Sequence, residues 1–117
     1  MKVDQLTELV FEALDDLKAV DVRVLDVREK TNVTDVMVVA TGTSARHVKS
    51  LANNVVVKAK ESGEVPIGIE GEDTGEWVLV DLGDVVVHIF QAEVRDFYQI
   101  EKLWETEPTS LSESSNG

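Results

Sequence analysis

The chain contains no cysteine, so disulfides, thiolate metal sites and cysteine nucleophiles are excluded. It also lacks a hydrophobic run long enough to span a membrane, and no apolar N-terminal stretch resembles a signal peptide. These absences suit a reducing compartment. We therefore expect a protein of the bacterial cytoplasm that makes no use of a membrane.

Basic residues are scarce: 11 Lys and Arg stand against 23 Asp and Glu, which gives a formal net charge of −12. Such a surface repels the phosphates of nucleic acids, so we expect direct RNA contact to be at most minor. It favours a basic protein partner, whose approach the long-range field accelerates. The alternative is that the acidity serves solubility alone.

The 117 residues are the length of one α/β domain. Apolar spacing and turn signals predict the order α-β-β-α-β-β-β-α with a five-stranded mixed sheet. The expected elements are a helix over 3–20 with Asp4 as N-cap, strands at 22–27 and 35–41, a helix from Thr43 or Ser44 to Gly63, a strand at 65–70, a hairpin at 76–90 and a helix at 92–104. The strand at 35–41 is predicted to be central. Pro66 indicates that the strand at 65–70 is an edge strand, or that the proline stands among its first residues. Residues 105–117 are predicted to form a disordered tail rich in Ser and Glu.

The most informative segment is the hairpin EWVLVDLGDVVVHIF, residues 76–90. A two-residue turn at Gly83-Asp84 sets the register, because glycine tolerates the positive φ that a type II′ turn requires. One face then becomes entirely apolar, and the other carries an acid, an imidazole and an indole among apolar side chains. The apolar face pairs Leu82 with Val85, Val80 with Val87 and Val78 with Ile89, and the second pairs Asp81 with Val86, Leu79 with His88 and Trp77 with Phe90.

Gly42-Thr43-Ser44 joins a strand to a helix and has two interpretations. It resembles the Gly-Ser step of nucleotidyltransferases, whose magnesium ions also require paired carboxylates, and Glu70 and Glu72 have suitable spacing. The simpler interpretation is helix capping, which we favour because no lysine-rich phosphate clamp accompanies the pair. His47 and His88 lack a third ligand at fixed spacing. We therefore expect no enzyme activity, no cofactor and no metal.

The second helix is the one mildly basic element, through Arg46, Lys49, Lys58 and Lys60. Most such charges form a solvated helix face. An assembly factor that contacts RNA through these residues is the alternative, although aromatic side chains that stack on bases do not accompany them.

Trp77 has two interpretations as well. A buried indole under a helix is the commoner arrangement. However, Trp77 adjoins the acidic loop at 70–76 and shares a strand face with Asp81. An aromatic anchor ringed by carboxylates is typical of a docking site for a basic surface.

Three segments together resemble one family, the Iojap family of ribosomal silencing factors (RsfS). They are TDVMVVATGTSARHVKSLA at 34–52, PIGIEGEDTGEWVLVDLGDVVVHIF at 66–90 and VRDFYQIEKLW at 94–104. The resemblance covers residues 1–104 as one domain, with the motifs in the family's order. It implies an α/β fold like a nucleotidyltransferase core that has lost its catalytic residues.

The resemblance also implies a function and partners. Members of the family bind the large ribosomal subunit through its basic protein fourteen. They block joining of the small subunit and so repress translation when nutrients are short, and organelle relatives act in large-subunit assembly. Isolated members are often homodimers.

The family's partner contacts fall on Trp77 and Leu82 of this sequence. We add Asp81, Asp84 and Glu70 as partner-binding residues because of their charge. By strand parity Trp77 and Leu82 point to opposite faces, so both can contact one partner only if Leu82 swings around at the turn.

Overall fold

The computed structural model describes residues 1–29, 32 and 34–98, and for residues 96–98 the backbone alone. Its elements follow the predicted order. They are α1 (Val3–Asp16), β1 (Val20–Asp26), β2 (Val36–Gly42), α2 (Ala45–Glu61), β3 (Gly68–Glu70), β4 (Trp77–Asp81), β5 (Val85–Gln91) and α3 (Ala92–Tyr98). The predicted residues 99–104 of the last helix and the tail at 105–117 lie outside the described residues.

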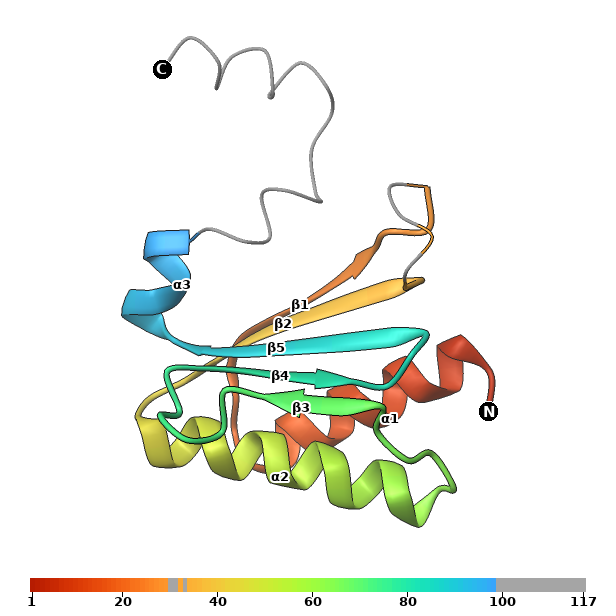
Figure 1. Ribbon diagram of the computed structural model, residues 1–117, viewed down its shortest axis with the longest axis horizontal. Helices are drawn as coiled ribbons and strands as arrows, with labels where there is room; N and C mark the ends of the chain where they lie inside the picture. The colour runs from red at the N-terminus through yellow and green to blue at the C-terminus, as the bar shows by residue number, and fades with distance from the viewer. Residues whose placement is uncertain (30–31, 33, 99–117) are drawn as a thin grey trace, which may run out of the picture.

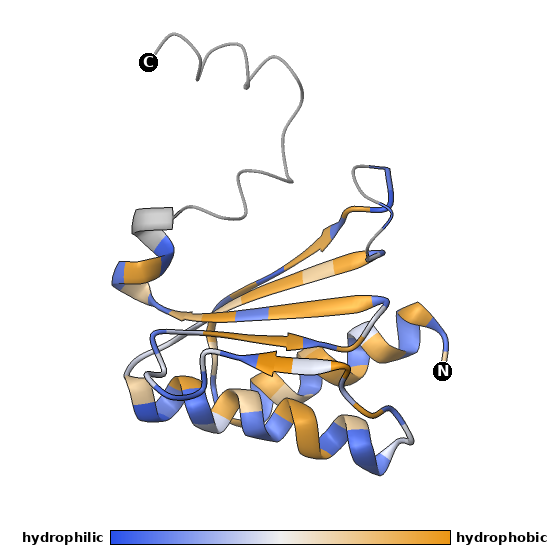
Figure 2. Cartoon of the chain, viewed as in Figure 1, coloured by the Kyte–Doolittle hydropathy of each residue, from blue (hydrophilic) through white to orange (hydrophobic). Residues whose placement is uncertain are grey.

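The five strands form one mixed sheet in the order β1-β2-β5-β4-β3. β2 and β5 are parallel, and the other neighbouring pairs are antiparallel. Every residue of β2 is buried, as predicted for a central strand. The sheet therefore has two edges, β1 and β3, and its middle strands are mostly hydrophobic in Figure 2.

Helices α1 and α2 cover one face of the sheet (Figure 1). Apolar residues of both helices are buried against the inward side chains of β2, β4 and β5: Leu6, Val10, Ala13 and Leu14 of α1, and Val48, Leu51, Ala52, Val55 and Ala59 of α2. Leu17 and Val20, at the end of the predicted first helix, are exposed instead. Burial of each such Val, Leu or Ile contributes about 1.5–3 kcal/mol. This layer is the main core, and it holds the sheet as a rigid platform.

The opposite face of the sheet holds a second, smaller core of Val27, Met37, Val39 and Phe90. Helix α3 lies at one end of the sheet (Figure 1). Its Val94 packs against the small core. Arg95 of α3 is only 6% exposed. Its Nη1 donates hydrogen bonds to the carbonyl oxygen of Asp21 and to Oγ1 of Thr41, each at 2.7 Å.

Both predicted boundaries of the first helix were wrong. Lys2, not Asp4, is the N-cap of α1, and Asp4 lies in the first helical turn. The helix also ends at Asp16 rather than at residue 20, because Lys18 adopts a left-handed conformation with φ 61° and the chain then enters β1.

The third strand is shorter than the predicted 65–70, since β3 begins only at Gly68. Pro66 has no backbone N–H to donate to a strand ladder, so residues before it do not extend the pairing. Among the described residues, no helix has the length and apolar character needed to cross a membrane.

Candidate functional site: the outer face of the β4–β5 hairpin

The hairpin pairs in the predicted register. Trp77 lies opposite Phe90, Leu79 opposite His88 and Asp81 opposite Val86. Gly83 has the expected positive φ, at 88°, and the backbone N–H of Leu82 donates to the carbonyl oxygen of Val85 at 2.9 Å. One face of the hairpin packs against α1 and α2. We call the other the outer face, and its hairpin side chains are Trp77, Leu79, Asp81, Val86, His88 and Phe90.

Trp77 is half-buried at the start of β4. Its indole Nε1–H donates a hydrogen bond to Nδ1 of His88 at 3.0 Å. The rings of Trp77 and Phe90 lie 4.8 Å apart between centroids. These contacts hold the indole in one orientation on the sheet. The side chain therefore loses less conformational entropy when a partner binds to it.

His88 is buried, with 5% of its surface exposed. Burial lowers the pKa of His88 to about 4, because the charged imidazolium loses its hydration there. Since Nδ1 accepts the indole hydrogen bond, the neutral ring carries its proton on Nε2. His88 therefore packs within the protein as a neutral side chain.

Leu82 lies on the other side of the sheet. It is 7% exposed and belongs to the main core beside α1 and α2. Strand parity had predicted this separation from Trp77, and the structure does not bring the two side chains onto one surface. A partner contact of Leu82 stays a prediction that requires the turn to move.

Two of the three predicted acidic residues, Asp81 and Glu70, lie on the outer face, and the third, Asp84, lies in the turn. Asp81 is half-buried on the outer face, and its Oδ1 accepts a hydrogen bond from the N–H of Gly83 at 2.8 Å, which ties the carboxylate to the turn. Asp84 is exposed in the turn itself. Glu70 is exposed on β3, opposite Leu79 in the ladder.

Two apolar residues complete this surface: Leu79 and Val86 are both half-buried on the outer face. The alternation of side chains along β4 and β5 predicts that both residues lie on the outer face. The sequence pattern alone does not predict which outer-face residues stay accessible to solvent. We define the outer patch as Trp77, Leu79 and Val86 with the flanking carboxylates of Asp81 and Glu70. This arrangement suits contact with a basic protein surface.

The Gly42-Thr43-Ser44 junction is a helix cap. The hydroxyl of Ser44 accepts from the N–H of His47 at 3.0 Å, as the capping interpretation predicts. A pocket of about 210 Å³ beside it is lined by Val20, Thr41, Gly42, Thr43, Gln91, Ala92 and Glu93. Glu70 and Glu72 do not line this pocket, so the described residues do not assemble the paired carboxylates of a nucleotidyltransferase there.

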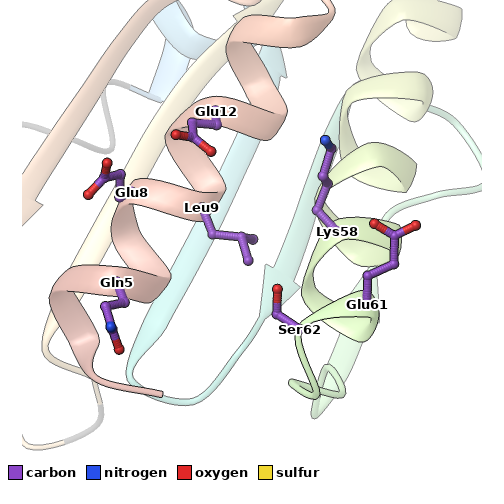
Figure 3. Close-up of a pocket in the computed structure, with 7 residues that line it drawn as sticks. All are labelled: Gln5, Glu8, Leu9, Glu12, Lys58, Glu61 and Ser62. Carbon is purple, nitrogen blue, oxygen red and sulfur yellow. The ribbon is translucent and has the colours of Figure 1, made fainter.

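A second hollow, of about 350 Å³, opens between α1 and α2 on the helical side (Figure 3). Leu9 points from α1 toward α2, and the rim carries Glu8, Glu12 and Glu61. Lys58 on this rim forms an ion pair with Asp16 at 3.3 Å. Among the residues that the structure describes, no group of three or more His, Asp or Glu side chains is arranged to hold a metal ion.

The basic residues of the RNA alternative lie on α2, on the helical side of the sheet. Arg46 and Lys49 are exposed near its start and Lys60 near its end. Helix α2 covers the sheet face opposite the outer patch, although Lys49 at its start lies beside Gly75 in the loop before Trp77.

Gly71 fixes the position at which Trp77 enters the sheet. Its φ is +84°, and a Cβ there would overlap the backbone carbonyl of Trp77. We expect Gly71→Ala to lower the free energy of unfolding by more than about 2 kcal/mol, from left-handed strain plus the overlap. Gly63→Ala is the matched control, because Gly63 has φ +87° with no atom within 4 Å of an added Cβ.

Urea unfolding of the two variants measures this difference. We expect Gly63→Ala to cost about 1 kcal/mol, which is the strain term alone. Equal losses in both variants would contradict a role for Gly71 in positioning Trp77.

The sequence and the fold of this chain both resemble those of known proteins of one family. The model of the family described as "Ribosomal silencing factor during starvation" (RsfS) matches residues 1–116. The chain is 51% identical over 104 residues to the ribosomal silencing factor RsfS of Chromobacterium violaceum, covering 89% of this chain and 85% of that protein. It resembles a crystal structure of a protein from the same organism with a TM-score of 0.89 and 50% identity, covering 92% of this chain and 89% of that one.

A more distant relative comes from an animal. The chain is 32% identical over 105 residues to the mouse protein named "Mitochondrial assembly of ribosomal large subunit protein 1". The match covers 87% of this chain and 44% of the mouse protein.

Proposed function

Because the chain belongs to the ribosomal silencing factor (RsfS) family, we propose that it binds the large ribosomal subunit and acts by binding rather than by catalysis. The proposed partner there is the subunit's basic protein fourteen. Occupation of that site sterically keeps the small subunit from joining and so represses translation when nutrients are limited. This role requires that the protein act in the bacterial cytoplasm, with the ribosomes.

The outer patch is the observation that supports this proposal most strongly. It combines a fixed indole, two half-buried aliphatic side chains and carboxylates on a rigid sheet. A standard protein–protein interface buries roughly 1,200–2,000 Å² in total, and its apolar centre is bordered by polar groups. A chain with a net charge of −12 fits a basic ribosomal protein better than it fits RNA.

The exposed carboxylates at the rim are expected to act mainly on the association rate. Removing two charges with Glu70→Gln and Asp84→Asn should slow binding to isolated large subunits about threefold at low salt, and the difference should shrink at physiological salt. Stopped-flow fluorescence at two salt concentrations measures the rate.

The matched control is Asp4→Asn with Glu8→Gln, which removes the same net charge from exposed positions of α1. If this control slows association as much as the first variant does, net charge rather than the outer patch governs the encounter.

A role in assembly of the large subunit is the second candidate. The name of the mouse relative favours it, and both roles use the same subunit. Accumulation of large-subunit precursors in cells that lack the protein would favour assembly over silencing.

A further inference from the structure

We propose that Val65 and Ile67, at the β3 edge, form an additional apolar contact with the same basic protein partner. Val65 is 72% exposed and Ile67 is 73% exposed, more than any other large hydrophobic residue that the structure describes. Keeping two large aliphatic side chains in water is unfavourable, and neighbouring exposed apolar residues often mark protein interfaces. This inference rests on the proposed function, which it extends to a second contact region.

Ile67 lies beside the hairpin turn, and Val65 precedes it by two residues in the chain. The N–H of Ile67 donates to the carbonyl oxygen of Asp81 at 2.7 Å. Its Cδ1 lies 3.3 Å from the position that a Cβ on Gly83 would take. The edge segment is therefore continuous with the turn, and one partner surface can contact both.

We expect the β3 edge to contact the partner through its side chains rather than by pairing its backbone with a strand of the partner. β3 has three residues, and Pro66 offers no N–H for a new ladder. The N–H of Ile67 is already bonded to Asp81, and the ladder itself begins only at Gly68. Short edge strands and prolines are typical of edges that resist strand addition.

The acidic side chains around this segment favour binding of a basic protein over binding of a second copy of this chain. Asp84 follows Gly83 in the turn, Asp81 is hydrogen-bonded to it, and Glu70 lies three residues beyond Ile67. A two-fold contact through this segment would bring these carboxylates toward their own copies, which is repulsive. Lys and Arg side chains of a partner would instead pair with them while Val65 and Ile67 are buried.

The test uses the full chain and isolated large ribosomal subunits. The double variant Val65→Ser with Ile67→Ser is expected to weaken binding at least about tenfold, as measured by co-sedimentation. The control is Phe11→Ser with Val57→Ser, at residues 45% and 41% exposed on α1 and α2. Both residues lie on the helices that cover the sheet face opposite the outer patch, so the control should bind within about twofold of the unmodified protein.

A second pair of variants tests the chemistry of the partner. Val65→Lys with Ile67→Lys should weaken binding more than the serine variant, because a basic partner repels the new charges. If the lysine variant binds better than the serine variant, the partner surface is acidic and the proposal is wrong. Serine substitutions that leave binding unchanged would also overturn it.

Two outcomes separate this inference from the proposed function. If the unmodified protein does not co-sediment with large subunits, the proposed function itself fails. If it does, and the serine variant binds normally but loses self-association in analytical ultracentrifugation, the edge is an interface between copies and the inference alone is overturned.

Discussion

Replacing Trp77 with alanine is expected to weaken binding to the large ribosomal subunit by more than about 2 kcal/mol, roughly 30-fold in Kd. The indole is half-buried on the outer face and is held by His88 and Phe90. A rigid aromatic side chain on a sheet loses little conformational entropy when a partner covers it. Little of its favourable contact energy is therefore offset, and replacing the indole with a methyl group loses most of that energy. Equilibrium titration of labelled protein with isolated large subunits measures the change.

The control must separate lost contact from lost folding, because Trp77 also packs within the protein. His88→Ala removes the acceptor of the indole hydrogen bond but little surface, since His88 is 5% exposed. We expect this control to weaken binding by no more than about threefold, through the lost restraint on the indole, while both variants remain folded by circular dichroism. If the two variants lose the same affinity, the effect is structural and Trp77 is not an anchor.

Acid should destabilise the protein through His88. The folded-state pKa of about 4 lies below the ordinary value of 6.5, so the unfolded chain binds more protons between these two pH values. The contribution of neutral His88 to the free energy of unfolding is fully present above pH 6.5. It is lost as the pH falls toward 4 and does not change further at lower pH. The difference of about 2.5 pKa units corresponds to about 3 kcal/mol.

Urea unfolding at intervals from pH 7 to pH 4 measures this loss. His88→Gln should remove this part of the pH dependence, because glutamine does not titrate and its Oε1 can still accept the indole hydrogen bond. His47→Gln, which replaces the other histidine of the chain, should retain it. A pH profile that is the same with and without His88 would show that burial of this imidazole does not govern acid stability.

The hairpin was predictable in detail from the sequence. A two-residue turn at Gly83-Asp84 allows only one pairing register between β4 and β5. Strand alternation then assigns each side chain to one face of the hairpin. For the same reason, the separation of Trp77 from Leu82 was evident before the structure was known. Helix α2 was equally predictable, because Ser44 and Gly63 are strong boundary signals.

What covers the outer face was not predictable, because long-range contacts decide it. Arg95 and Asp21 are 74 residues apart, and Asp21 adopts an uncommon positive φ of 50°. No local pattern signals that an arginine on a short helix will bind a β1 carbonyl. The strand predicted at 65–70 is shorter for a related reason: its residues suit a strand, but the ladder begins only after Pro66, at Gly68, and Val65 and Ile67 stay exposed.

The most direct test of silencing is a subunit-joining assay with purified large and small ribosomal subunits, followed by light scattering. Prior addition of the unmodified protein to the large subunits should suppress the rise in scattering in proportion to occupancy. The Trp77→Ala variant at the same concentration should leave joining close to its uninhibited extent. Full joining on large subunits that are saturated with the unmodified protein would contradict the proposed silencing function.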